Sequence, residues 1–178
     1  AAHTIARLSC RNGTIQADVC KQGGIQRLLA LLSDRNVDAQ IQAAAALSEL
    51  AQGPNGFGHR KTQDAISKSG GIGPLLAMVE CNPYVVRAVA ESVRTLAEVA
   101  RRNRANQDTI ASMGGVKPLV ELLQSGSHPE IVQANAALAI TEICRRNQDN
   151  QTSVADIGGI SQLVMLLRHS GKASVEAE

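Results

Sequence analysis

The chain has 178 residues and a formal net charge of +2, and 44% of its residues are apolar. It contains no Trp, one Tyr and one Phe, so aliphatic side chains and Ala must form the core, which favours closely packed helices over a sheet. The small charge and the lack of aromatic stacking platforms argue against nucleic-acid binding, and no apolar stretch reaches the about 18 residues of a membrane-spanning helix.

In chain order, four stretches begin with a Gly pair and continue with the same apolar pattern. They read GGIQRLLALL from residue 23, GGIGPLLAMV from residue 70, GGVKPLVELL from residue 114 and GGISQLVMLL from residue 158. The pairs are therefore separated by 47, 44 and 44 residues. A fixed period above about 40 residues is typical of a repeat array.

Each full period contains three predicted helices. A short apolar segment such as 106–113 precedes the Gly pair, and a short helix such as 116–124 follows it. A polar break at 125–130 then leads into a longer helix, 131–146, whose apolar residues recur at helical spacing. We expect glycine to supply the positive φ that ends the first helix. We also expect its missing side chain to let two helix axes approach closely.

A second landmark keeps the same period. The long predicted helices carry Glu49, Glu98 and Glu142 at one register, and Arg7 occupies the corresponding place near the N-terminus. The first period is longer because residues 53–59, GPNGFGH, form an insertion that we expect to be a loop. The Gly pairs lack the spacing of a phosphate-binding loop and recur with structural periodicity, so we interpret them as structural.

No group of residues has the pattern of a catalytic, cofactor or metal site. The four cysteines form no CxxC pair, and the four histidines lack metal-ligand spacing. We find no nucleophile with a paired base, and we therefore expect a protein that is not an enzyme and uses no cofactor. The scattered cysteines are predicted to be buried free thiols, which suits a reducing compartment; we expect the cytoplasm, with the nucleus as an alternative.

The Gly-Gly-[Ile/Val] helix start, the three-helix unit and the period together resemble the armadillo repeat. Ankyrin and TPR units, at about 33–34 residues, are too short for this period. The resemblance covers essentially the whole chain. It implies an all-α fold, a right-handed α-solenoid with three helices per repeat and a long inner groove lined by the third helices. It also implies a binding or scaffolding role without catalysis.

We expect residues 1–178 to form a single armadillo-repeat array. The predicted units are residues 1–11 (third helix only), 12–53, 54–103 (with the loop insertion 53–59), 104–148 and 149–178 (first two helices only). Both ends fall inside a unit, so we expect a piece of a longer array. Its apolar residues 163–167 would then lack a partner helix, which predicts end-to-end self-association.

The resemblance places the partner groove on the third helices. In armadillo import adaptors this surface carries Asn, with Trp four residues before it. This chain has Arg or Glu at the Asn positions and no Trp at all, so we do not expect the import-adaptor type. The side chains expected to line the groove, at helical spacing, are Gln42, Ala45, Glu49, Gln52, Glu91, Arg94, Glu98, Arg101, Asn135, Leu138, Glu142 and Arg145.

The recurring Glu register has two interpretations. In the first, each carboxylate holds a Lys or Arg side chain of an extended partner. In the second, Arg94 pairs with Glu98, and Glu142 pairs with Arg145 or Arg146, within their own helices. Exposed pairs of that kind contribute only about 0.3–0.5 kcal/mol. Recurrence at one register slightly favours the first interpretation.

We therefore predict a protein-protein interaction module within a larger scaffold or adaptor. It would bind an extended or helical segment of a protein or peptide partner along the groove, and the partner would supply Lys or Arg side chains. The alternative is a structural spacer or assembly segment of a larger repeat protein. Such a segment would be contacted at its edges or by end-to-end association.

Overall fold

The structure is a computed structural model, and it describes residues 1–56, 58–124 and 126–173, with side chains up to residue 168. All regular structure in these ranges is helical, as predicted. The helices are α1 (Ala2–Ser9), α2 (Gly13–Lys21), α3 (Gly24–Leu32), α4 (Val37–Gln52), α5 (Arg60–Lys68), α6 (Ile72–Cys81), α7 (Val86–Ala100), α8 (Arg104–Ser112), α9 (Val116–Glu121), α10 (Glu130–Cys144), α11 (Gln148–Asp156) and α12 (Gly159–Ala173). No helix among them combines the length and hydropathy that a membrane crossing requires.

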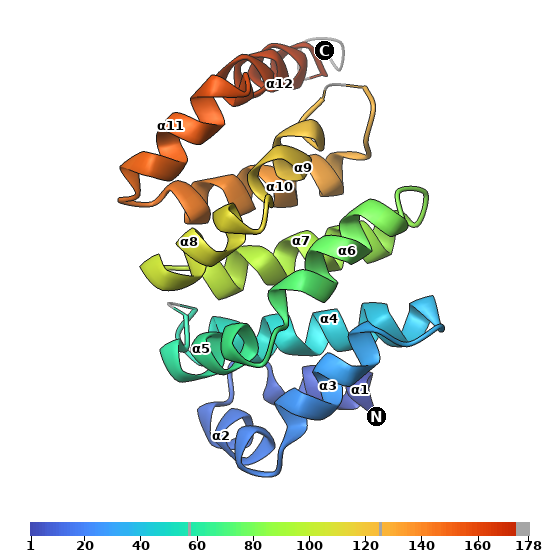
Figure 1. Cartoon of the computed structure of the whole chain (residues 1–178). Helices are drawn as coiled ribbons and strands as arrows, with labels where there is room; N and C mark the ends of the chain where they lie inside the picture. The colour runs from blue at the N-terminus through green and yellow to red at the C-terminus, as the bar shows by residue number, and fades with distance from the viewer. Residues whose placement is uncertain (57, 125, 174–178) are drawn as a thin grey trace.

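The helices follow one another in sets of two short helices and one long helix. The sets are α2–α3–α4, α5–α6–α7 and α8–α9–α10, which confirms the predicted three-helix repeat. Figure 1 shows the sets stacked in succession, with the two termini at opposite ends of the stack. The most extensive contacts join α1 to α4, α4 to α7 and α7 to α10, so these four helices form one continuous layer.

Alanine allows this layer to pack closely. Ala43, Ala44 and Ala46 of α4 are fully buried, and so are Ala97 and Ala100 of α7. The distance between packed helix axes depends on the size of the side chains at the contact, and a methyl group keeps it short. The scarcity of aromatic residues is thus consistent with a core made by closely spaced helices.

The Gly pair acts as predicted at Gly114 and Gly115. Gly114 follows α8 with a φ of 79°, a conformation that L side chains rarely adopt. A Cβ on Gly115 would lie 2.8 Å from Cγ2 of Ile110 and 3.0 Å from Cδ2 of Leu76, which belongs to the preceding repeat. The first glycine therefore adopts the positive φ of the turn after α8. The second glycine, which has no Cβ, allows close packing between two successive repeats.

Buried amide side chains connect successive repeats. Asn147, which caps α11, donates through Nδ2 to Oε1 of Gln107 at 3.2 Å and to Oδ1 of Asp108 at 2.8 Å. Nε2 of Gln107 in turn donates to the backbone oxygen of Glu142 at 2.8 Å. The same contacts recur one repeat earlier among Asn103, Gln63, Asp64 and Glu98. Each contact satisfies a polar group that would otherwise be buried without a partner.

One prediction about the side chains was wrong. The cysteines are free, but Cys10 and Cys81 are exposed, and Cys20 and Cys144 are only half-buried. Cys10 caps the C-terminus of α1, and Cys81 is the last residue of α6, so both lie at helix ends. In the predicted insertion, residues 53–56 and 58–59 lie outside any helix, and residue 57 lies outside the described residues.

Candidate functional site

A pocket of about 510 Å³ lies across the layer of long helices, and we call it the N-terminal pocket. Helices α1, α4 and α7 contribute its lining residues, which are His3, Ala6, Arg7, Cys10, Gln42, Ala45, Glu49, Arg87, Glu91 and Arg94. Five of the twelve side chains predicted for the partner groove are among them: Gln42, Ala45, Glu49, Glu91 and Arg94. The other seven predicted side chains lie outside this pocket.

Arg94 organises the N-terminal pocket. Its Nη1 lies 3.0 Å from Oε1 of Glu49 on the preceding long helix, and its Nη2 lies 3.0 Å from Oε2 of Glu91 on its own helix. The within-helix pair proposed from the sequence, Arg94 with Glu98, is not formed. Side chains on a helix tilt toward its N-terminus, so Arg94 reaches back to Glu91 rather than forward to Glu98.

A second ion-pair network joins α7 to α10. Arg101 Nε lies 2.8 Å from Oε2 of Glu98, and Arg101 Nη1 lies 3.3 Å from Oε1 of Glu142. Arg145 Nε lies 2.8 Å from Oε2 of Glu142, so the within-helix pair of Glu142 and Arg145 is confirmed. The network thus runs from Glu98 through Arg101 and Glu142 to Arg145.

Burial separates the Glu residues predicted for the groove into two kinds. Glu98 is 4% exposed and Glu142 is 1% exposed, and arginines of the chain itself occupy both carboxylates. Burial raises the pKa of Glu98, against the opposing effect of Arg101. Glu49 and Glu91 differ, because 18% and 24% of their side-chain surface is exposed. The solvent-accessible carboxylates of the predicted groove on these helices are therefore those of the N-terminal pocket.

Of the remaining predicted groove residues, Asn135 and Leu138 make contacts within the protein. Asn135 donates through Nδ2 to the backbone oxygen of Ala90 on α7 at 2.9 Å. Leu138 is partly buried and packs against the core. Gln52 is half-buried at the end of α4. The partner role predicted for these three residues stays a prediction.

The twelve side chains predicted for the groove do not include Arg87, His3, Arg7 and Cys10, although all four line the N-terminal pocket. Arg87 lies one helical turn before Glu91, so continuing the same helix face backward would have found it. The other three come from α1, which contributes to the pocket as a long helix does. Within the described ranges, no group of three or more His, Cys, Asp or Glu could hold a metal ion.

Residues 16–52 and 103–145 match the family model described as Armadillo/beta-catenin-like repeat. The crystal structure of an engineered protein superposes on 93% of this chain with a TM-score of 0.84 and 28% sequence identity, and the match covers 64% of that protein. The chain has the armadillo-repeat fold. The predicted resemblance and the solenoid fold are thereby confirmed.

Designed armadillo repeat proteins superpose equally well on this armadillo array. The protein YIII(Dq)4CqI gives a TM-score of 0.83 at 22% identity, over 93% of this chain and 66% of its own length. The protein YIII(Dq.V1)4CPAF, solved in complex with the peptide (KR)4, gives 0.82 at 22% identity, over 94% and 66%. The array thus spans slightly less than two thirds of these solved chains. No curated protein matches the sequence.

Proposed function

We propose that the array is a protein-interaction module that holds an extended or helical segment of a protein or peptide partner across α1, α4 and α7. The observation that carries the proposal is the N-terminal pocket of about 510 Å³, which spans three successive helices of one layer. A segment lying across these helices would meet several shallow contacts in a row. A designed protein of the same fold has been solved with a (KR)4 peptide, which supports a peptide as the class of partner.

The charges of the pocket suggest how a Lys or Arg of the partner would be held. Glu49 and Glu91 share the single guanidinium of Arg94 and remain partly exposed. An incoming cation would take the place of Arg94 between the two carboxylates. The exchange would leave no carboxylate without a positive partner, and the displaced Arg94 side chain, already 29% exposed, would turn into solvent, where water compensates its charge.

The labelled peptide (KR)4 is a suitable probe, measured by fluorescence anisotropy at fixed salt concentration. We expect saturable binding, and we expect the Glu49→Gln/Glu91→Gln variant to bind at least about tenfold more weakly, because charged hydrogen bonds are lost. Arg94→Gln should act in the opposite direction, since it removes the internal competitor for both carboxylates.

The matched control is Glu80→Gln/Glu121→Gln, which removes the same number of charges from exposed positions outside the pocket. It should bind the peptide as the unmodified protein does. Equal weakening in both double variants would show that the peptide responds to overall charge, and it would overturn the pocket as the binding site. Glu98 and Glu142 are unsuitable for this test because their substitution disturbs buried ion pairs.

A second candidate function is assembly through the last helix. Ile160, Val164 and Leu167 of α12 are 59%, 42% and 74% exposed, so this helix presents an uncovered apolar row. Such rows are uncommon on a monomer surface and mark contact sites. This observation favours the spacer or assembly role, in which arrays join through their ends.

A further inference from the structure

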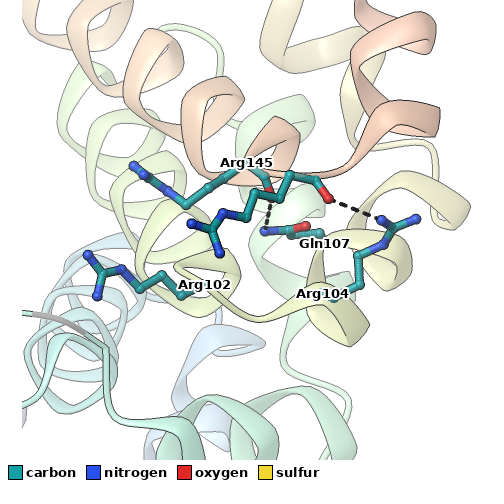
Figure 2. Close-up of a pocket in the computed structure, with 5 residues that line it drawn as sticks. Arg102, Arg104, Gln107 and Arg145 are labelled. Atoms are coloured by element: carbon teal, nitrogen blue, oxygen red, sulfur yellow. Dashed lines mark hydrogen bonds between the residues drawn. The ribbon is translucent and has the colours of Figure 1, made fainter.

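A second pocket, of about 470 Å³, lies at the edge of the array, and we call it the basic pocket. It is lined by Arg102, Arg104, Gln107, Arg145 and Arg146 (Figure 2). All four arginines are exposed, and no carboxylate belongs to its lining. Helix-end complementation alone explains cations near the ends of α7 and α10, but it does not explain why four of them line one hollow.

Two turns of successive repeats build the basic pocket. Arg102 lies between α7 and α8, and Arg146 lies between α10 and α11. Both have a φ of 53°, a left-handed conformation that is unfavourable for residues with a side chain. Arg11, between α1 and α2, has a φ of 52°, so an arginine occupies this turn in three repeats, and the last two of these arginines line the basic pocket. Figure 2 shows the side chains of Arg102 and Arg145 extending toward the same side, away from Arg104.

Hydrogen bonds hold the two turns in a fixed relation. Arg104 Nη1 donates to the backbone oxygen of Arg146 at 3.3 Å, and Gln107 Nε2 donates to the backbone oxygen of Arg145 at 3.4 Å (Figure 2). Gln107 itself is buried, at 2% exposure. The backbone of the two turns is thus held in place before any ligand arrives, which lowers the entropic cost of binding.

The charges of the pocket are only partly neutralised. Arg104 pairs with Asp108 and Asp149, and Arg145 pairs with Glu142. Arg146 forms no ion pair with any residue that the structure describes. An anion entering the pocket would therefore meet a guanidinium that is not already occupied by a carboxylate, beside others that can share it.

We propose that the basic pocket binds a phosphate-type oxyanion. A phosphate offers three oxygens in a tetrahedral arrangement and nearly two negative charges, so it can accept hydrogen bonds from several guanidinium groups that approach from different directions. A carboxylate offers two oxygens in one plane and suits a single guanidinium fork. The oxyanion is either a phosphorylated side chain of a protein partner or a free phosphate ion. The proposal does not depend on peptide binding at the N-terminal pocket.

The test is a titration of the 15N-labelled full chain, followed by NMR, with ionic strength kept constant by exchanging chloride for the probe. The probes are inorganic phosphate and a short peptide with one phosphoserine, beside the same peptide without phosphate. We expect saturable shifts of the amide signals of residues 102–104 and 145–148. The Arg102→Gln/Arg146→Gln variant should bind at least about tenfold more weakly.

The control variant is Arg27→Gln/Arg35→Gln, which removes two exposed arginines far from the basic pocket in the sequence. It should leave the affinity unchanged, and circular dichroism should show that both variants are folded. Tighter binding of the phosphopeptide than of free phosphate would support the site and identify a modified partner. Equal or tighter binding of free phosphate would support the site and identify the ion. Shifts that never saturate, or that persist in the Arg102→Gln/Arg146→Gln variant, would overturn the proposal.

Discussion

Different physical constraints fix the two glycines of each pair. Gly114 has a positive φ but open space where a Cβ would stand, whereas Gly115 has ordinary backbone angles and no space. An alanine at 114 would be strained in its own backbone, by about 1–2 kcal/mol. An alanine at 115 would instead push on Ile110 of its own repeat and on Leu76 of the preceding one.

We therefore expect Gly115→Ala to lower the free energy of unfolding by about 2–3 kcal/mol, as overpacking of a close contact does. Gly114→Ala should lower it by less, and Gly73→Ala is the control. Gly73 lies inside α6 with negative φ, and only the flexible end of Met113 approaches it, at 3.3 Å. Urea unfolding measures all three. A larger loss in Gly114→Ala than in Gly115→Ala would contradict the close-approach argument.

We expect Glu98 to make the stability of the array depend on pH. Burial raises the pKa of its carboxyl above the ordinary value of 4.5, so the folded protein binds this proton more tightly than the unfolded chain does. Binding of this proton therefore contributes to the free energy of unfolding. The contribution is fully present below the pKa that Glu98 has in the unfolded chain, and it is lost as pH rises through the higher pKa that Glu98 has in the folded protein.

Glu98→Gln removes this titration while keeping the shape of the side chain. Between about pH 4 and about pH 7, the unfolding free energy of the unmodified protein should fall relative to that of the variant, because only the unmodified protein must ionise the carboxyl of Glu98. Urea unfolding at several pH values gives the difference directly. Glu80→Gln, at an exposed position, should show no such trend. The idea fails if the difference between the protein and Glu98→Gln is constant over this range.

At the scale of helices, one Gln register connects each first helix to the ends of the long helices. Gln63 and Gln107 are buried and donate to backbone oxygens at the end of the long helix that follows them. Gln151 occupies the same register on α11 but is exposed, and its Nε2 donates to the backbone oxygen of Cys144 at 2.9 Å. A glutamine at the same repeat position is thus buried on α8 and exposed on α11, so the effect of burial on its hydrogen bonds can be compared within one protein.

We expect Gln107→Leu to cost at least about 2 kcal/mol, because it removes the buried hydrogen bond to the backbone oxygen of Glu142 and the one from Asn147 at once. Gln151→Leu should cost less than about 1 kcal/mol, since water can satisfy the groups that it exposes. The measurement is urea unfolding of both variants at one pH. Equal losses would show that the register contributes by helix propensity and not by buried hydrogen bonding.

Local signals in the sequence were sufficient to predict the helices and their order. The Gly pair at 114–115 and the apolar spacing of 131–146 indicated a helix break and a long helix, and α10 indeed covers Glu130–Cys144. Both signals act within a few residues, through backbone angles and helix period. The tilt of a side chain toward the helix N-terminus is equally local. Applying it would have paired Arg94 with Glu91 before the structure was known.

The arrangement of the site depended on contacts that no local pattern encodes. Arg94 meets Glu49 across 45 positions of sequence, and Arg101 meets Glu142 on the next long helix. These pairs depend on the offset between stacked repeats, which the packing of Ala and Gly against neighbouring helices sets. The groove face predicted from the sequence stays a prediction. The sequence did not predict which carboxylates are buried or that a basic pocket lies at the edge.

At the scale of the whole molecule, one end of the array carries an uncovered apolar row. Along the layer from α1 to α10, each long helix is covered by the next one. The last described helix, α12, keeps Ile160, Val164 and Leu167 exposed on positions one turn apart. Burying such a row removes apolar surface from water, which contributes about 25 cal/mol for each Å² buried. We therefore propose that the chain self-associates through this end.

The expected result is a sedimentation coefficient that rises with protein concentration, and an Ile160→Glu/Leu167→Glu variant that stays monomeric. Ile131→Glu, at another exposed apolar position on α10, is the control and should behave as the unmodified protein.

Leu8→Glu on α1 distinguishes two geometries of assembly. If it also abolishes assembly, the α12 end meets the α1 end of a second copy, and open chains form; if it has no effect, two α12 ends meet and close a dimer. An unmodified protein that is monomeric at every concentration would refute both arrangements.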